Sequence, residues 1–259
     1  MTLWQTATAI FFSYTALMAL VMPRLQWERR LQSLAGAAAG LLVIVATARV
    51  QHPLLNDWVI PPMVLLLAYW TSGLLFVAPM PGVERALVEI DCRLQIRRLG
   101  GATPRLLAEF LETAYAAVYV LIPIALVIHL TAVGRPNAGK FWAVILITDY
   151  ICFGMLPWIQ TRPPRALESG EPWGAWFRAL NLWLLGKASI HVNTFPSGHA
   201  AEGLTAALLV IGAPAPLVAV MFLAGLSVSA GAVLGRYHYA ADIVAGWLVA
   251  VGVYLVVSR

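Results

Sequence analysis

Long apolar runs are the feature that most restricts how this chain can fold. A helix needs roughly 17–25 residues to cross the hydrocarbon core of a bilayer, and eight apolar runs come close to that length. Backbone amides in lipid must be hydrogen-bonded within the chain, and the alternating pattern of barrel strands is missing. The sequence therefore predicts an all-α fold, a polytopic membrane helical bundle of about eight transmembrane helices. The predicted spans cover residues 4–22, 32–50, 59–78, 106–131, 139–159, 197–213, 215–234 and 239–257.

The composition excludes a single soluble domain. Of the 259 residues, 61% are hydrophobic and 11% are charged, whereas soluble domains carry about 45–50% apolar and about 25% charged residues. No basic run resembles a nucleic-acid-binding patch, so we expect no nucleic acid partner. The first apolar run lacks a basic start and is followed by Arg24, Arg29 and Arg30, which predicts a retained anchor rather than a cleaved signal peptide.

Basic residues are distributed unevenly between the two predicted membrane faces. The loops after the first, third, fifth and seventh spans carry 13 of the 17 lysine and arginine residues. The positive-inside rule makes this face cytoplasmic and places both termini outside. Between the spans, residues 83–99 and 173–185 have the pattern of helices that lie in the membrane interface. The second of these either guides a lipid toward the site or packs between spans.

The segment Pro196-Ser197-Gly198-His199 opens the sixth predicted span and has the character of an anion site. Proline suits the first turn of a helix, and the amides of Ser197, Gly198 and His199 are expected to point out of the helix N-terminus. Such amides bind phosphate. The Ser197 hydroxyl adds a donor, and His199 is placed to exchange a proton with a bound group.

A second pair of polar residues begins the eighth predicted span. His238 and Asp242 are four residues apart, which places them on one face of a helix. A carboxylate that accepts from one imidazole nitrogen leaves the other nitrogen free as a nucleophile or base. By span parity this pair lies on the same membrane face as Ser197 and as Arg162 and Arg165. We expect the guanidinium groups, the helix N-terminus and the histidines to converge on a phosphoester, with no metal ion and no cofactor.

These segments resemble the signature of the type 2 phosphatidic acid phosphatase (PAP2) superfamily, over roughly residues 84–257. Arg162-Pro163 matches the end of the first motif, Pro196 to His199 match the second, and His238 with Asp242 match the end of the third. The resemblance implies a six-helix core on spans three to eight. It therefore divides the chain into two extra N-terminal transmembrane helices, residues 1–58, and a catalytic membrane domain, residues 59–259.

Two positions depart from that signature. Met155 stands where the first motif has lysine, and Ala232 stands where the third has arginine. The candidates to replace the missing charge are Arg165, Arg236 and Lys187. The alternative for each is that it is a basic residue that only faces the lipid headgroups. The sequence around Ser197 and His238 looks most similar to the inositolphosphotransferase branch, which includes inositol phosphorylceramide synthases and transfers a headgroup.

The resemblance implies an enzyme in which His238 attacks phosphorus to form a phosphohistidine. Asp242 orients His238, and His199 protonates the leaving oxygen and then activates the acceptor. Water as acceptor gives a lipid phosphatase, the leading hypothesis, and an alcohol such as inositol gives a phosphotransferase. A lipid-binding or transport protein without turnover is the third alternative. The expected partners are a membrane lipid phosphate and the bilayer, in a bacterial plasma membrane, and the sequence does not predict an oligomeric state. Family members usually have an extracytoplasmic site, whereas the charge bias favours a cytoplasmic one.

Overall fold

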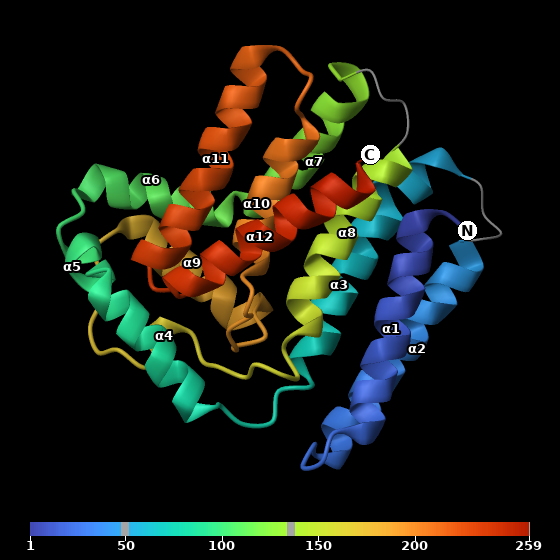
Figure 1. The fold of residues 1–259 in the computed structure, drawn as a ribbon, viewed down its shortest axis with the longest axis horizontal. Coiled ribbons are helices and arrows are strands. Elements are labelled where there is room, and N and C mark those ends of the chain that lie inside the picture. The colour runs from blue at the N-terminus through green and yellow to red at the C-terminus, as the bar shows by residue number, and fades with distance from the viewer. Residues whose placement is uncertain (48–51, 134–137, 259) are drawn as a thin grey trace.

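The computed structural model describes residues 1–47, 52–133 and 138–258 and is built from helices joined by short connections (Figure 1). No β-strand occurs in these three ranges, and Thr161 pairs with Asn193 only through an isolated bridge. The predicted all-α class is therefore confirmed. Residues 48–50, which belong to the second predicted span, lie outside the described residues.

Four described helices are long and apolar enough to cross a membrane. They are α1 (Leu3–Val21), α2 (Trp27–Thr47), α11 (Ala215–Leu234) and α12 (Ala240–Val257). The chain is therefore a helical integral membrane protein. Three further predicted spans contain shorter helices, α3 (Ile60–Gly73), α8 (Ala138–Gly154) and α10 (Gly198–Leu209). The count of eight spans and the six-helix core stay predictions.

The predicted span 106–131 is not one continuous helix. It consists of α6 (Arg105–Ala116) and α7 (Val118–Thr131), which are bent by 64° relative to each other. The pair makes a fifth candidate span if the two helices are counted as one. The physical reason for the break lies in α6, where Glu109 and Glu112 accept hydrogen bonds from the segment that follows residue 172. Because carboxylates are costly in lipid, α6 cannot continue into the hydrocarbon layer with the apolar α7.

Helix α10 lies at the centre of the bundle. It packs against α7, α8, α11 and α12, whereas the hairpin of α1 and α2 packs beside α8 and α3 (Figure 1). A Cβ atom added at Gly225 of α11 would lie 2.4 Å from the carbonyl oxygen of Gly203 in α10. Only glycine permits this approach, so α10 and α11 cross with their backbones nearly in contact.

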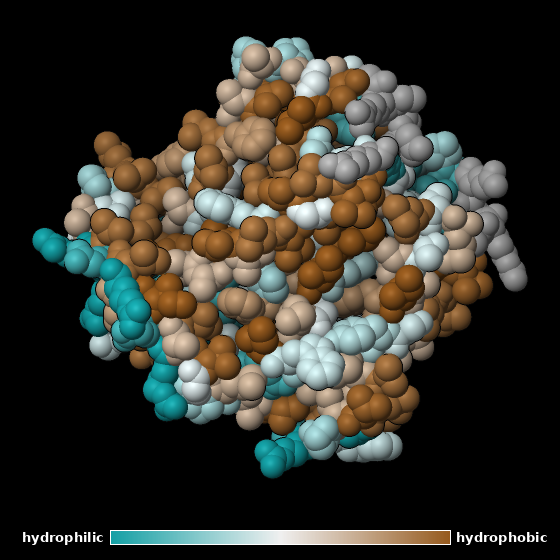
Figure 2. All heavy atoms as spheres, viewed as in Figure 1, coloured by the Kyte–Doolittle hydropathy of each residue, from teal (hydrophilic) through white to brown (hydrophobic). Residues whose placement is uncertain are grey.

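Short helices surround the bundle at the ends of the long ones. The predicted helix over 83–99 is divided into α4 (Pro81–Arg93) and α5 (Ile96–Gly101), because Gln95 takes a left-handed conformation with φ of 54°. Helix α9 (Trp176–Ala188) lies within the second predicted interfacial segment and its continuation. Single turns occur at η1 (Leu55–Val59) and η2 (Pro164–Ala166). Apolar residues cover much of the face in Figure 2, and hydrophilic ones gather along the edge where α4 and α5 lie.

Candidate active site

Ser197 begins the site as the N-cap of α10. The helix starts at Gly198, and the Ala200 amide donates to the Ser197 hydroxyl oxygen at 3.4 Å, as the predicted helix start requires. The Ser197 amide donates to the carbonyl oxygen of Asp242 at 3.0 Å. The expectation that this amide faces an anion is therefore wrong, because it joins α10 to α12. The amides of Gly198 and His199 lie in the first turn, where a helix supplies no partner for them.

Gly198 allows α10 to start close to α8. A Cβ atom at this position would lie 3.1 Å from the Phe153 ring and 3.6 Å from Oδ1 of Asp149. Asp149 is fully buried on α8, and Glu202, one turn after Gly198, is buried as well. The two carboxyl groups therefore lie on the inner side of the helix start rather than at its open end.

His238 and Asp242 contact each other as the spacing predicts. The Nδ1 atom of His238 lies 3.3 Å from Oδ2 of Asp242. Their arrangement differs from the expected shared helix face, since α12 begins at Ala240 and His238 precedes it. Oδ2 also accepts from the Tyr239 amide at 2.9 Å, so Asp242 caps the helix with the oxygen that faces the imidazole. This contact leaves Nε2 of His238 as the free ring nitrogen.

Asn193 binds the same oxygen of the Asp242 carboxylate. Its Nδ2 donates to Oδ2 of Asp242 at 2.9 Å and to the Thr161 hydroxyl at 3.0 Å, and its own amide donates to the Thr161 carbonyl oxygen at 2.9 Å. Asn193 and Asp242 are both buried. The amide side chain therefore fixes the carboxylate that faces His238, a role that no motif in the sequence indicated.

The two histidines lie side by side. The ring centroids of His199 and His238 are 5.9 Å apart. Nε2 of His199 lies 3.2 Å from the hydroxyl oxygen of Tyr119. The two rings are therefore close enough for both to contact one bound group.

The two arginines of the Arg162-Pro163-Pro164-Arg165 segment take different positions. The Arg162 guanidinium forms a two-point ion pair with Glu84, with Nε to Oε1 at 3.0 Å and Nη2 to Oε2 at 2.8 Å. This contact keeps the pKa of Glu84 below its usual range, while the Arg162 side chain stays 45% exposed. The Arg165 guanidinium lies over the ring of Tyr237, 5.4 Å from its centroid.

The other two basic candidates lie farther from the pair. Arg236 is buried, with Nη1 donating to the Gly170 carbonyl oxygen at 3.0 Å and Nε 3.4 Å from Glu168 Oε2. Lys187 is exposed near the end of α9. Across the described ranges, no hydrogen bond or ion pair joins Lys187 to either histidine. The structure thus brings Arg165 toward the histidines, engages Arg162 and Arg236 with acids, and leaves Lys187 at the surface.

The two positions that depart from the signature are occupied by packed or neutral side chains. Ala232 is fully buried beside Tyr115 and Tyr237, and its carbonyl oxygen accepts the amides of Tyr237 at 2.8 Å and His238 at 3.0 Å. Met155 follows the end of α8. Neither residue supplies a charge. In the described part of the chain, no group of three or more His, Cys, Asp and Glu side chains is arranged to hold a metal ion.

The charge state of His238 depends on its surroundings. Burial and the nearby Arg165 cation lower the pKa of this imidazole to about 3, from an ordinary value of about 6.5. His238 is therefore neutral at pH 7. Its Nε2 then carries a lone pair.

Replacing Arg165 with glutamine is expected to raise the pKa of His238, because a cation that opposes protonation is removed. Burial, the larger cause, still holds the value below that of a free imidazole. A pH titration of ring-labelled histidine by NMR in detergent micelles measures the change. The matched control is Arg98→Gln, an exposed arginine of α5, which should leave the titration unchanged. An unchanged or lower pKa in Arg165→Gln would contradict the expected electrostatic effect.

Several residues of the site were not found by sequence reasoning. Glu84 binds Arg162, and Asp91 on the same helix accepts from the Ala240 amide at 3.0 Å, at the start of α12. Both acids lie on the buried side of the amphipathic segment, which is the one signal that the sequence offered. Asn193 and Tyr119 belong to no motif and carried no such signal.

Comparison with known proteins gives one result. The model of a family described as PAP2 superfamily matches residues 82–256, which begin in α4 and end in α12 and cover more than half of the chain. No curated protein and no solved structure matches the chain.

Proposed function

Because the chain belongs to the PAP2 superfamily, we propose that it is an integral membrane phosphatase that cleaves a phosphate or pyrophosphate ester of a lipid. One observation carries the proposal. His238 is paired with Asp242 at 3.3 Å, beside the ring of His199, where the N-terminus of α10 opens. A nucleophile, its orienting carboxylate, a proton carrier and an anion site therefore occupy one place.

In the first step, Nε2 of His238 forms a bond to phosphorus while the bond from phosphorus to the leaving oxygen breaks. The electron pair of that bond passes to the oxygen, which receives a proton from His199. Asp242 accepts from Nδ1 of His238 and stabilises the positive charge that develops on the ring. The product, an alcohol from a lipid phosphate or a lipid monophosphate from a lipid pyrophosphate, departs, and the phosphoryl group stays on His238.

In the second step, His199 takes a proton from a water molecule whose oxygen bonds to phosphorus. The bond between phosphorus and nitrogen breaks, its electron pair returns to His238, and inorganic phosphate leaves. We assign the stabilisation of charge on the phosphoryl oxygens to the amides of Gly198 and His199 and to the guanidinium of Arg165. Arg162, Arg236 and Lys187 are proposed as further phosphate-binding residues. No step needs a cofactor or a metal ion.

A lipid substrate is supported by the surroundings of His199. Tyr119, whose hydroxyl contacts His199, is 56% exposed on α7 among the exposed apolar residues Val120 and Ile124. Trp176 and Trp183 of α9 are 70% and 60% exposed, and amphipathic rings of this kind favour the headgroup layer. The proton carrier therefore borders a surface that suits lipid chains.

A phosphotransferase is the second candidate, since the same phosphohistidine can pass its group to an alcohol. The residues Phe195-Pro196-Ser197 and His238-Tyr239 favour it, because they resemble those of the inositolphosphotransferase branch.

We further propose eight spans, with the site on the cytoplasmic face of a bacterial plasma membrane, on the basis of the basic loops. External labelling of a cysteine placed at Lys187 would contradict this orientation.

The test is phosphate release by the purified protein from a panel of lipid phosphates and pyrophosphates, with a chelator present and with or without inositol. We expect release of inorganic phosphate from at least one substrate without added divalent metal. A lipid product that forms only with inositol would favour the transferase. Neither release nor transfer would contradict an enzymatic role and favour a lipid-binding or transport protein.

A further inference from the structure

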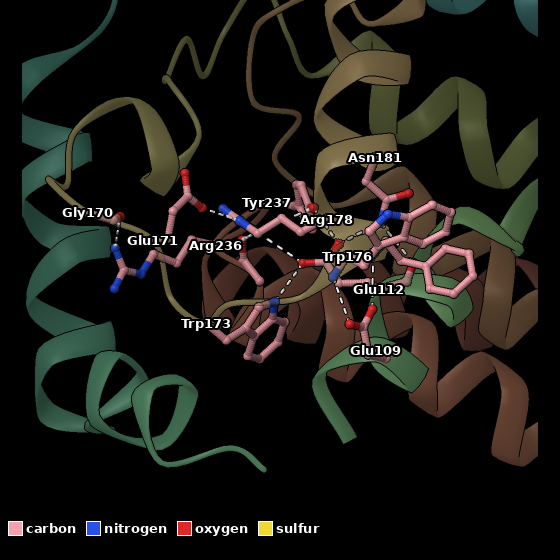
Figure 3. A network of polar contacts seen from close by, with 12 residues as sticks. Glu109, Glu112, Gly170, Glu171, Trp173, Trp176, Arg178, Asn181, Arg236 and Tyr237 are labelled. Carbon is pink, nitrogen blue, oxygen red and sulfur yellow. Dashed lines mark hydrogen bonds and ion pairs between the residues drawn. The ribbon is translucent and has the colours of Figure 1, made fainter. Parts of the chain in front are cut away.

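Glu112 of α6 is a buried carboxylate that none of the three motifs contains. Its side chain is fully buried and accepts four hydrogen bonds (Figure 3). Tyr237 and Asn181 donate to Oε2 at 2.6 Å each, Trp173 donates to Oε1 at 2.7 Å, and Arg178 donates to Oε1 at 3.1 Å. Three separate parts of the chain therefore meet on one side chain.

Arg178 extends this network to the segment before His238. It is buried, balances the charge of Glu112, and also pairs with Glu171. Its Nη1 donates to the Gly235 carbonyl oxygen at 3.0 Å. Residues 235–237 are thus held at a backbone oxygen by Arg178 and at the Tyr237 hydroxyl by Glu112. This support matters because the segment is not helical and Arg236 has a positive φ of 60°.

Tyr115, one turn after Glu112 on the same helix, contacts both halves of the site. Its ring stacks on Tyr237, with centroids 4.1 Å apart and planes 6° apart, and on His199, with centroids 5.1 Å apart and planes 14° apart. Tyr119, just past the bend into α7, meets the edge of the His199 ring. The region of α6 and the bend therefore touches His199 directly and reaches His238 through its neighbour Tyr237.

We infer that Glu112 and Tyr115 are positioning residues, which set the separation of the two histidines from outside the motifs. The inference rests on the proposed function of the same site. Glu112 holds the segment that carries His238, and Tyr115 fixes the His199 ring against that segment. A buried acceptor with four donors specifies one arrangement, because each donor is left unsatisfied if the carboxylate is removed.

Four substitutions test the inference through phosphate release. Glu112→Gln loses one acceptor oxygen and turns an amide NH₂ toward donors. Tyr237→Phe removes only the hydroxyl that donates to Glu112, and Tyr115→Leu removes the stacked ring. We expect each of these three substitutions to lower kcat about 10- to 100-fold and to leave KM little changed, because small displacements of reacting groups have effects of this size. Tyr115→Phe keeps the ring and should stay within about threefold of the parent protein.

A second readout does not require turnover. Ring-labelled histidine NMR of the unliganded protein reports the surroundings of His199 and His238, and the melting temperature in detergent identifies variants that do not fold. We expect the signals of both histidines to move in Glu112→Gln, Tyr237→Phe and Tyr115→Leu, and to stay in place in Tyr115→Phe. If the parent protein releases no phosphate, moved signals still support positioning, and only the proposed function fails. Folded variants with parental kcat and unmoved signals would overturn the inference.

Discussion

Replacing His238 with alanine is expected to abolish turnover, with a fall in kcat of about 10⁴-fold or more, as for other groups that form the covalent bond. The reason is that Nε2 is the free nitrogen of the imidazole that Asp242 orients at 3.3 Å. Alanine leaves no nucleophile to accept the phosphoryl group. Water then has to attack the lipid phosphate directly, without the covalent intermediate.

The measurement combines phosphate release with trapping of the intermediate. A substrate labelled in its phosphoryl group, quenched in base during turnover, should label the parent protein and not His238→Ala. The matched control is His52→Ala, which removes an exposed histidine outside the site and should retain both label and turnover. Labelling of His238→Ala at parental levels would contradict the assigned nucleophile.

Replacing His199 with asparagine is expected to lower kcat about 10²- to 10⁴-fold, the range for loss of a general acid or base. The size of the loss should depend on the leaving group. An alkoxide leaving a lipid phosphate needs the proton that His199 supplies, whereas an aryl phosphate with an acidic phenol does not. Asparagine retains a polar side chain beside Tyr119, so the substitution removes proton transfer more than packing.

Pre-steady-state measurements separate the two steps of this prediction. With an aryl phosphate, His199→Asn should release phenol in a burst near the parental rate. Phosphate should then appear slowly, since His199 also activates water. A burst as strongly reduced as lipid turnover would assign His199 to substrate positioning rather than to proton transfer.

The all-α class and the membrane helices followed from the sequence because long apolar runs have few physical solutions in lipid. The contact of His238 with Asp242 followed as well, since a spacing of four residues is a local property. The break within the segment 106–131 did not follow from the sequence. Averaged hydropathy treats this segment as one span, but it cannot show that Glu109 and Glu112 need donors from residues more than 60 positions later.

The residues that hold the motif side chains in place were less predictable than the motif residues themselves. Asn193 and Glu84 act on Asp242 and Arg162 across 49 and 78 residues of sequence. Asn193 lies in a connection, where nothing local distinguishes it from other polar residues, and Glu84 is distinguished only by its place on the buried side of α4. The availability of the Ser197 amide was predicted wrongly for the same reason, because its acceptor is the distant Asp242 carbonyl oxygen.

The ion pair of Arg162 with Glu84 has a consequence for the entropy of ligand capture. An exposed arginine normally samples many rotamers and loses that freedom when it closes on a ligand. Here Nε and Nη2 are already engaged by the carboxylate, so the side chain is ordered before any ligand arrives. Both N–H groups of Nη1 and the second N–H group of Nη2 are left to meet an oxyanion. In its proposed role as a phosphate-binding residue, Arg162 would therefore meet a phosphoryl group with an edge that is already oriented, at little further cost in side-chain entropy.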